Sequence, residues 1–395
     1  MMKHVLLTLA VLALLAAPAV RADEAKDQIK AFESAMKGAD DGQKVKLIQE
    51  MAKSGNEGAP KAIAKYMMHR SDEVAVAAIT AIGELKEKKY YGRLMGMQKP
   101  MKDRPAVLAA AATAIGAYGD KRGIDTLVDL GKKWLSKDHT VASAAAEGLG
   151  HIPDKRCVEE LIKLLDLTYP KASDNSGTIS QEARDKLAKS RPAIMKGLQT
   201  LTGWDFEEPR AWKNFWELMA KKWKPGKEEI KWSEISKWED PGYGFRVAKP
   251  DKKWEMSRNE YSRIQMDFYV LNSDEQRMQN ASVCVIAYDL SNFAATTEAL
   301  KAQSKEDWYR GNWKDTKEET WVRDPKYKVG KERGFMISFT GQDRSGNILK
   351  QKNIYLVHNG FMFEIATWMR SGADQPNPEL PGQIDKAIQS FRYTL

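Results

Sequence analysis

The stretch VLAAAATAIG at residues 107–116 recurs twice more in nearly the same form. It reads VAVAAITAIG at residues 74–83 and VASAAAEGLG at residues 141–150, so the closing glycines are 33 and 34 residues apart. A helical unit of this length that repeats along a chain is typical of an α-solenoid, in which each pair of helices buries its apolar face by stacking on its neighbours. The repeat therefore predicts a long surface rather than a catalytic pocket.

The other positions of the repeat indicate how each unit packs. Two alanines stand six and five positions before each closing glycine, an Ile or Leu stands directly before it, and a leucine follows eleven positions later. We expect both alanines to admit the next unit's helix at close range, the aliphatic residues to face the core, and the glycine to end the first helix. An acidic residue and a lysine, four and five positions after the glycine, predict an exposed turn.

This repeat resembles the HEAT repeat of the short bacterial kind, which begins with Asp or Pro shortly before its valine. Asp72, Pro105 and Asp138 hold that position here. An ordinary alanine-rich bundle would not keep nine positions in step through three units. Residues 24–70 are helical in period but match the repeat poorly, as expected of a terminal capping unit with a polar outer face.

A fourth unit is expected when Gly203 is aligned with the earlier closing glycines, with the polar stretch Lys171–Gln181 as a loop inserted within it. Leu201-Thr202-Gly203 followed by Trp212 and Trp216 resembles the closing motif of bacterial secreted HEAT-repeat proteins. The two tryptophans are four residues apart and share one helical face, so we expect them to cap the solenoid.

The composition changes between residues 221 and 240, where six lysines alternate with three tryptophans around Pro225-Gly226. We interpret this segment as a linker. Six of the twelve tryptophans fall between residues 204 and 238. Because tryptophan is costly to expose, this cluster is either an inter-domain joint, which we favour, or a binding surface.

Beyond residue 240 the apolar period changes from helical to alternating. Strands are expected near 243–247, 264–270, 281–289, 334–340, 347–357 and 361–369, with helices at 296–310 and 380–389. Asn359-Gly360 between the last two strands predicts a type I′ hairpin. The segment 241–395 is therefore expected to be an α+β domain with an antiparallel sheet and helices on one side of it.

This segment resembles the PsbP-like fold in its opening Gly244-Phe245, its aromatic hairpin and its closing Ser390-Phe391. The resemblance implies a non-enzymatic binding or assembly role.

The first residues predict export. Met1-Met2-Lys3-His4 precedes an apolar run from Val5 to Val20, and small residues then lead into Asp23-Glu24. This is the pattern of a signal peptide, residues 1–22, cleaved after Ala19 or Ala22. The run has 16 residues, short for a bilayer span of about 20. The expected organisation is thus signal peptide 1–22, HEAT-like α-solenoid 23–220, linker 221–240 and α+β domain 241–395, with no integral membrane segment after cleavage and a periplasmic or extracellular location.

The net charge indicates the class of partner, and the two cysteines are expected to be structural. The formal net charge is +9, and it is +7 once Lys3 and Arg21 leave with the signal peptide. This excess favours acidic partners such as envelope polymers, anionic lipids or acidic proteins, whereas export argues against nucleic acid. Cys157 and Cys284, the chain's two cysteines, are expected in different domains and are interpreted as buried small hydrophobic residues.

No arrangement in the sequence predicts catalysis or a bound cofactor or metal. Gly-rich phosphate loops, Cys-x-x-Cys, Gly-x-Ser-x-Gly and His-Glu-x-x-His are absent from the sequence. His139 and His151 flank one expected helix but are twelve residues apart, which does not match the i, i+4 spacing of a helical metal pair. We therefore expect a protein that is not an enzyme.

The sequence favours an exported, non-enzymatic scaffold or adaptor that binds a protein partner through its solenoid. Two alternatives stay open: an envelope protein that binds acidic polymer or lipid through the Lys/Trp segment, and a protein similar to the HEAT-containing lyases that attach bilin pigments. We expect the second helices of successive units to line the concave face and to lead towards an aromatic end. The candidate partner-binding residues are Thr126, Asp129, Lys133, Glu160, Lys163, Trp212, Trp216, Lys221, Lys222 and Trp223.

Overall fold

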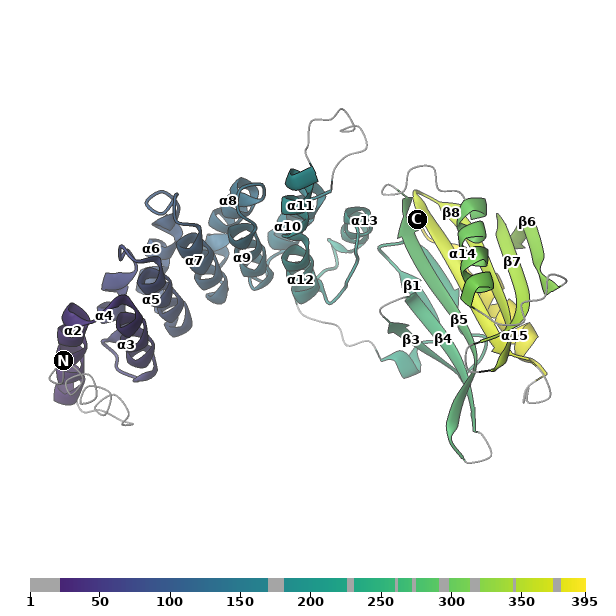
Figure 1. Ribbon diagram of the computed structural model, residues 1–395, viewed down its shortest axis with the longest axis horizontal. Coiled ribbons are helices and arrows are strands. Elements are labelled where there is room, and N and C mark those ends of the chain that lie inside the picture. The colour runs from purple at the N-terminus through teal and green to yellow at the C-terminus, as the bar shows by residue number, and fades with distance from the viewer. Residues whose placement is uncertain are drawn as a thin grey trace. The chain divides into compact units, whose positions relative to one another are not determined.

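The computed structural model describes residues 22–169, 181–225, 231–259, 262–271, 275–290, 298–312, 320–343, 346–371 and 378–395 (Figure 1). The expected signal peptide, apart from Ala22, and all but the last residue of the expected loop 171–181 lie outside these ranges. Two compact units make up the chain, and the first comprises the described residues up to Pro209 together with residues 222–225. Arg210–Lys221 is grouped with the second unit.

The first unit is helical, and most of its helices form two rows. Five helices lie side by side as a first row (Figure 1), and the middle three carry the repeated alanines: α3 (Asp41–Lys53), α5 (Asp72–Leu85), α7 (Pro105–Ala117), α9 (His139–Gly150) and α12 (Arg191–Thr202). The second row comprises α6 (Tyr91–Met95), α8 (Ile124–Trp134) and α10 (Lys155–Leu167). The unit also contains α2 (Ala22–Gly38), α4 (Ala59–Ile63) and α11 (Gln181–Ala188).

The residues predicted to open each unit start the first-row helices. Asp72 is the first residue of α5. Pro105 is the first residue of α7, where a backbone N–H would have no partner within the helix, so the missing N–H of proline costs no hydrogen bond. Asp138 caps α9 by accepting the backbone N–H of Thr140 at 2.8 Å. The core positions of the repeat are buried as expected: Val74, Val107, Val141, Ile82, Ile115, Leu149, Leu94, Leu127 and Leu161.

The closing glycines do not end the first helices as left-handed caps, so that expectation was wrong. Gly83 and Gly116 lie inside α5 and α7, Gly150 is still a helical residue of α9, and none of the three has a positive φ. A Cβ on Gly116 would lie 2.3 Å from the Cα of Gly148, and one on Gly83 would lie 2.8 Å from the Cβ of Ala114. The glycines are needed because adjacent first-row helices touch along their backbones.

The two alanines of the repeated pair differ in burial in α5 and α7, whereas both are buried in α9. The second alanine is fully buried in all three units, at Ala78, Ala111 and Ala145. The first alanine is half-buried in α5 and α7, at Ala77 and Ala110. Neighbouring residues on a helix point about 100° apart, so one alanine faces the adjacent helix while the other reaches the outer face of the row.

The fourth unit is displaced by four residues from the expected alignment. A Cβ on Gly197 would meet the backbone oxygen of Ala146 and the side chain of Leu161, just as one on Gly148 would meet Ala112 and Leu127. Gly197 therefore corresponds to Gly148, which places the anchor of this unit at residue 199 rather than at Gly203. Gly203 is instead the left-handed C-cap of α12, with φ +77°.

The second unit contains two antiparallel sheets and a few helices. The larger sheet has the order β3-β4-β5-β9-β8-β7-β6, and the smaller has the order β1-β2-β10. The strands are β1 (Lys237–Asp240), β2 (Phe245–Ala248), β3 (Trp254–Asn259), β4 (Ser262–Leu271), β5 (Arg277–Asp289), β6 (Val322–Val329), β7 (Glu332–Gln342), β8 (Ile348–His358), β9 (Phe361–Arg370) and β10 (Arg392–Tyr393). β1 falls within the expected linker and pairs with β2. Asn359 and Gly360 both have positive φ, which confirms the type I′ hairpin.

Helices cover both faces of the larger sheet, not one face as expected. On β8, the side chains of Gln351 and Asn353 hydrogen-bond Tyr309 of α14 (Glu298–Asn312). Lys352 between them pairs with Asp385 of α15 (Leu380–Ser390) at 2.8 Å. Successive residues of a strand point to opposite faces, so α14 and α15 lie on opposite sides of the sheet.

The two faces of this sheet also differ in polarity. The face towards α15 is apolar and includes Ile354, Phe363 and Ile365, all buried. The face towards α14 carries buried polar groups, among them Asn353 and Glu364.

The cysteines lie in different units: Cys157 in α10 is fully buried, as expected, whereas Cys284 in β5 is only half-buried. Within the described residues, no helix combines the length and apolar character needed to cross a membrane.

Candidate functional site

The stripe predicted on the second-row helices is only partly accessible. Asp129, Lys133 and Lys163 are exposed and Thr126 is half-buried. Glu160 is buried and pairs with Lys132 at 2.8 Å and with Lys163 at 2.7 Å. Burial by itself would raise the pKa of Glu160, but hydrogen bonds from the two lysines outweigh it and lower the pKa. Glu160 therefore joins α8 to α10 and is not presented to a partner.

The tryptophans of the predicted aromatic end are mostly enclosed. Trp212 is fully buried and Trp223 is buried, whereas Trp216 is half-buried. Lys221 and Lys222 beside them are exposed. Trp212 and Trp216 lie on α13 (Pro209–Met219), most of which is grouped with the second unit rather than with the solenoid.

Polar contacts attach α13 to the second unit. The guanidinium of Arg210 donates to the backbone oxygen of Asn359 at 3.1 Å and lies 3.9 Å from the carboxylate of Asp289. Asn214 donates to the backbone oxygen of Gly242 at 3.0 Å. These contacts join the helix to the unit with which most of it is grouped.

A groove of about 660 Å³ lies between α3 and α5 on the outer face of the first row. Its floor is formed by small or short side chains, several of them half-buried: Val45, Ala52, Val76, Ala77 and Thr80. Ala77 is the alanine of the repeated pair that is not used in packing against the next helix. The floor is therefore smooth and mainly apolar, and it is open to solvent.

Opposite charges line the two walls of this groove. Lys46 and Lys53 are exposed on α3, whereas Glu73 and Glu84 are exposed on α5. Within the described chain, none of these four side chains has an ion-pair partner within 4.0 Å. The groove thus combines an apolar floor with one basic and one acidic rim, all available to a ligand.

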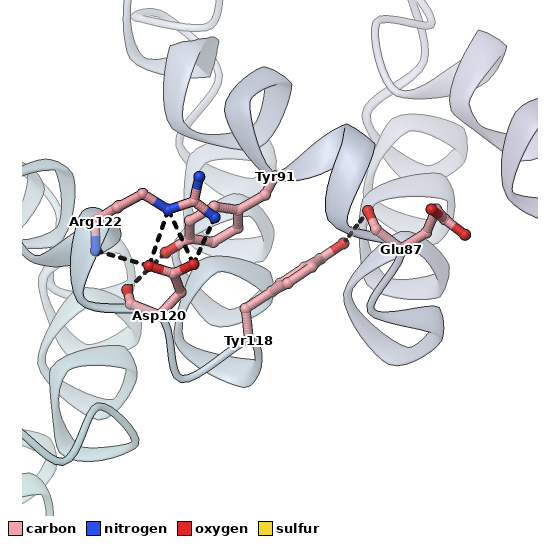
Figure 2. Close-up of polar contacts among 5 residues, drawn as sticks. All are labelled: Glu87, Tyr91, Tyr118, Asp120 and Arg122. Carbon is pink, nitrogen blue, oxygen red and sulfur yellow. Dashed lines mark hydrogen bonds and ion pairs between the residues drawn. The ribbon is translucent and has the colours of Figure 1, made fainter.

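Two tyrosines link successive units on another side of the solenoid (Figure 2). Tyr91 donates to the backbone oxygen of Asp120 at 2.9 Å, and Tyr118 donates to that of Glu87 at 3.1 Å. Their rings are 4.8 Å apart, and the guanidinium of Arg122 lies 5.3 Å from the centre of the Tyr91 ring. We call this group of five residues the tyrosine clasp. It fixes the turn after α7 to the preceding unit.

Contacts within the clasp shift the pKa of four of its members, and the shifts are largest for Asp120 and Tyr91. Hydrogen bonds from the side chain and backbone N–H of Arg122 lower the pKa of Asp120 to about 2. Burial, reinforced by the nearby Asp120 carboxylate, raises the pKa of Tyr91 to about 12. Both shifts follow from contacts that hold the units together, so we assign the clasp a structural role.

The depressed pKa of Asp120 predicts how the clasp responds to acid. A carboxylate with a lowered folded-state pKa stabilises the protein above its unfolded pKa near 4, and this contribution is lost as the pH falls towards 2. Because the side chain is partly exposed and screened by solvent, we expect less than about 1 kcal/mol. In denaturant titrations across this range, the gap in unfolding free energy between wild type and Asp120→Asn should close as the pH falls. Asp129→Asn, on the exposed surface of α8, serves as the control, and a gap that does not depend on pH would contradict the assignment.

Sequence reasoning missed the groove because it placed the binding surface on the second-row helices. The available signal was the charge pattern around the first repeat: Glu73 stands ten positions before Gly83 and Glu84 directly after it. The lysine wall belongs to α3, in the capping segment that matches the repeat poorly. No alignment of repeats would therefore have paired the two walls.

The described residues hold no group of three or more His, Cys, Asp or Glu side chains arranged to bind a metal ion.

A protein-family model matches residues 141–166, which comprise most of α9 and α10. The match is to the PBS lyase HEAT-like repeat. The N-terminal region is thus helical with a HEAT-like repeat, and the C-terminal domain consists of antiparallel sheets with a few helices. No curated protein matches the chain by sequence.

Two solved structures show limited similarity to this chain. One is a protein from Bacteroides thetaiotaomicron VPI-5482, with 13% identity and a TM-score of 0.26 over 40% of this chain and 48% of that one. The chain thus spans about half the length of that protein. The other is LpqN, involved in cell envelope biogenesis of Mycobacterium tuberculosis, with 9% identity and a TM-score of 0.29 over 38% of this chain and 83% of that one.

Proposed function

We propose that this protein is an exported, non-enzymatic scaffold that binds a protein partner through its HEAT-like solenoid, with the groove between α3 and α5 as the docking site. The single observation that carries the proposal is the groove itself, a volume of about 660 Å³ with an apolar floor. Solenoids stack their units into extended surfaces that bind other proteins, and this groove lies on such a surface.

The charges on the walls indicate the kind of partner. An amphipathic helix can place its apolar face against a groove floor of short side chains. Acidic residues along one edge of that helix would meet Lys46 and Lys53, and basic residues along the other edge would meet Glu73 and Glu84. We therefore commit to an amphipathic helical segment of a second protein, carrying acids on one flank and bases on the other.

The repeat offers a matched pair of variants to test this site. Thr80 and Thr113 occupy the same position, three residues before the closing glycine, and both are exposed. Only Thr80 lines the groove. We expect Thr80→Arg to abolish capture of the partner from the exported protein fraction, and Thr113→Arg to capture it as well as wild type. Photo-crosslinking from residue 49, whose glutamine lines the groove, should join the same partner through a helical segment.

Charge reversal gives a second measurement. Lys46→Glu combined with Lys53→Glu should weaken capture, and raising the salt concentration should reduce the difference from wild type because exposed charges are screened. Equal capture by Thr80→Arg and Thr113→Arg would show that the partner does not use the groove. Salt-sensitive retention on anionic vesicles that depends on Lys221 and Lys222 would favour the lipid-binding alternative. A change in visible absorbance on addition of a bilin would favour the lyase-like one.

A further inference from the structure

A cleft of about 420 Å³ in the second unit lies between α14 and the polar face of the larger sheet. Trp308 and Lys305 line it from α14, and Trp368 and Arg370 line it from β9. Trp308 is 52% exposed, an unusual degree for an indole, and Trp368 is half-buried. Exposed aromatic rings in a concave site generally mark a surface that binds a ligand.

The floor of the cleft is fixed by a buried hydrogen-bond network. Gln351 lines the cleft and donates to Asn353 Oδ1 at 2.7 Å. Asn353 in turn donates to Glu364 at 2.7 Å, and that carboxylate also accepts the hydroxyls of Tyr355 at 3.2 Å and Tyr288 at 2.9 Å. A polar network of this size under a helix adds little stability compared with an apolar core. It does hold the lining side chains in one arrangement, which lowers the entropic cost of binding a ligand.

Hydrogen bonds and an ion pair also orient the polar groups at the rim of the cleft. Arg370 donates to Asn347 Oδ1 at 2.7 Å, and Asn347 donates to Asp343 at 3.0 Å. Lys305 lies 3.9 Å from the buried Glu364 carboxylate. The positive charges of Lys305 and Arg370 are therefore balanced by Asp343 and Glu364. The cleft offers donors and acceptors in similar number and has no net charge with which to select an ion.

We propose that this cleft binds a neutral saccharide. Sugar hydroxyls are both donors and acceptors, which suits the mixture of guanidinium, ammonium, amide and carboxylate groups that line the site. The C–H face of a sugar ring packs on an aromatic ring, as Trp308 and Trp368 allow. A purely apolar ligand would leave these buried and half-buried polar groups without partners. An anionic ligand would gain nothing from a site with no net charge.

The whole chain is titrated with three neutral trisaccharides, cellotriose, maltotriose and tri-N-acetylchitotriose, by calorimetry and saturation-transfer NMR. Trigalacturonate and tri-alanine serve as the anionic and peptide comparators. We expect at least one neutral trisaccharide to bind saturably and more tightly than both comparators. Trp308→Ala should weaken that binding by about tenfold or more, which corresponds to about 1.4 kcal/mol.

The control is Lys350→Gln on β8, an exposed residue whose neighbours Leu349 and Gln351 line the cleft, so that its own side chain points to the opposite face. It should bind as wild type does. Because Trp308 is largely exposed, Trp308→Ala should keep the melting temperature of wild type, and its loss of binding is then not a loss of fold. The proposal is overturned if no neutral trisaccharide binds, if Trp308→Ala binds like Lys350→Gln, or if trigalacturonate or tri-alanine binds more tightly than all three sugars.

Discussion

Gly116→Ala is expected to destabilise the solenoid by about 1–3 kcal/mol, even though alanine is the better helix former. The added Cβ would lie 2.3 Å from the Cα of Gly148 and 2.9 Å from its backbone oxygen. Both atoms belong to backbone, so no rotamer change relieves the clash and α7 must move away from α9. For a unit of this size the melting temperature should fall by roughly 2–12 °C.

Gly92 provides the control for this substitution. It is also helical, in α6, but a Cβ there would have no heavy atom within 4 Å. Gly92→Ala should therefore leave stability unchanged or raise it by up to about 1 kcal/mol. If both variants shift the thermal midpoint in the same direction and by the same amount, the backbone contact between α7 and α9 does not limit stability.

Trp212→Ala is expected to cost about 3–5 kcal/mol, because it empties a site in which the indole is fully buried. The loss should appear in the second unit, with which Arg210–Lys221 is grouped. Hydrogen exchange read by mass spectrometry separates the two units: protection should fall in β5 and β9 and stay unchanged in α9 and α10.

Trp216→Ala on the same helix is the matched comparison. Trp216 is half-buried, so its truncation should cost clearly less than that of Trp212. Loss of protection confined to α9 and α10 in Trp212→Ala would instead restore the solenoid cap that the sequence favoured. A partner captured by wild type and lost with Trp216→Ala at unchanged stability would identify this helix as a binding surface.

The architecture was predictable because its signals are local in sequence. A unit of 33 or 34 residues that occurs three times specifies stacked helix pairs, and alternating residues with Asn359-Gly360 specify a hairpin. Finer features were not predictable from the same pattern. A displacement of four residues is close to one helical turn, so it keeps nearly the same side chains on the buried face. The fourth unit could therefore be aligned on Gly203, and only the contacts of Gly197 reveal the true position.

The candidate sites were harder to predict, since each is assembled from segments that are distant in sequence. The groove brings Lys46 on α3 near Glu73 on α5, and the intervening α4 belongs to neither wall. The cleft brings Trp308 on α14 to Trp368 on β9. Periodicity indicates which face of an element is buried, but it does not say which elements meet across a face. Both sites depend on that second kind of information.

Because Cys157 is buried, its reaction with a thiol reagent reports how often the solenoid opens locally. The thiol has no exposed surface, and burial raises its pKa to about 12, so the reactive thiolate is scarce and enclosed while α10 is folded. An alkylating reagent can modify it only when α10 separates from its neighbours. The labelling rate of Cys157 therefore measures how often the stacked units separate transiently. A bound partner that holds the units together would lower this rate.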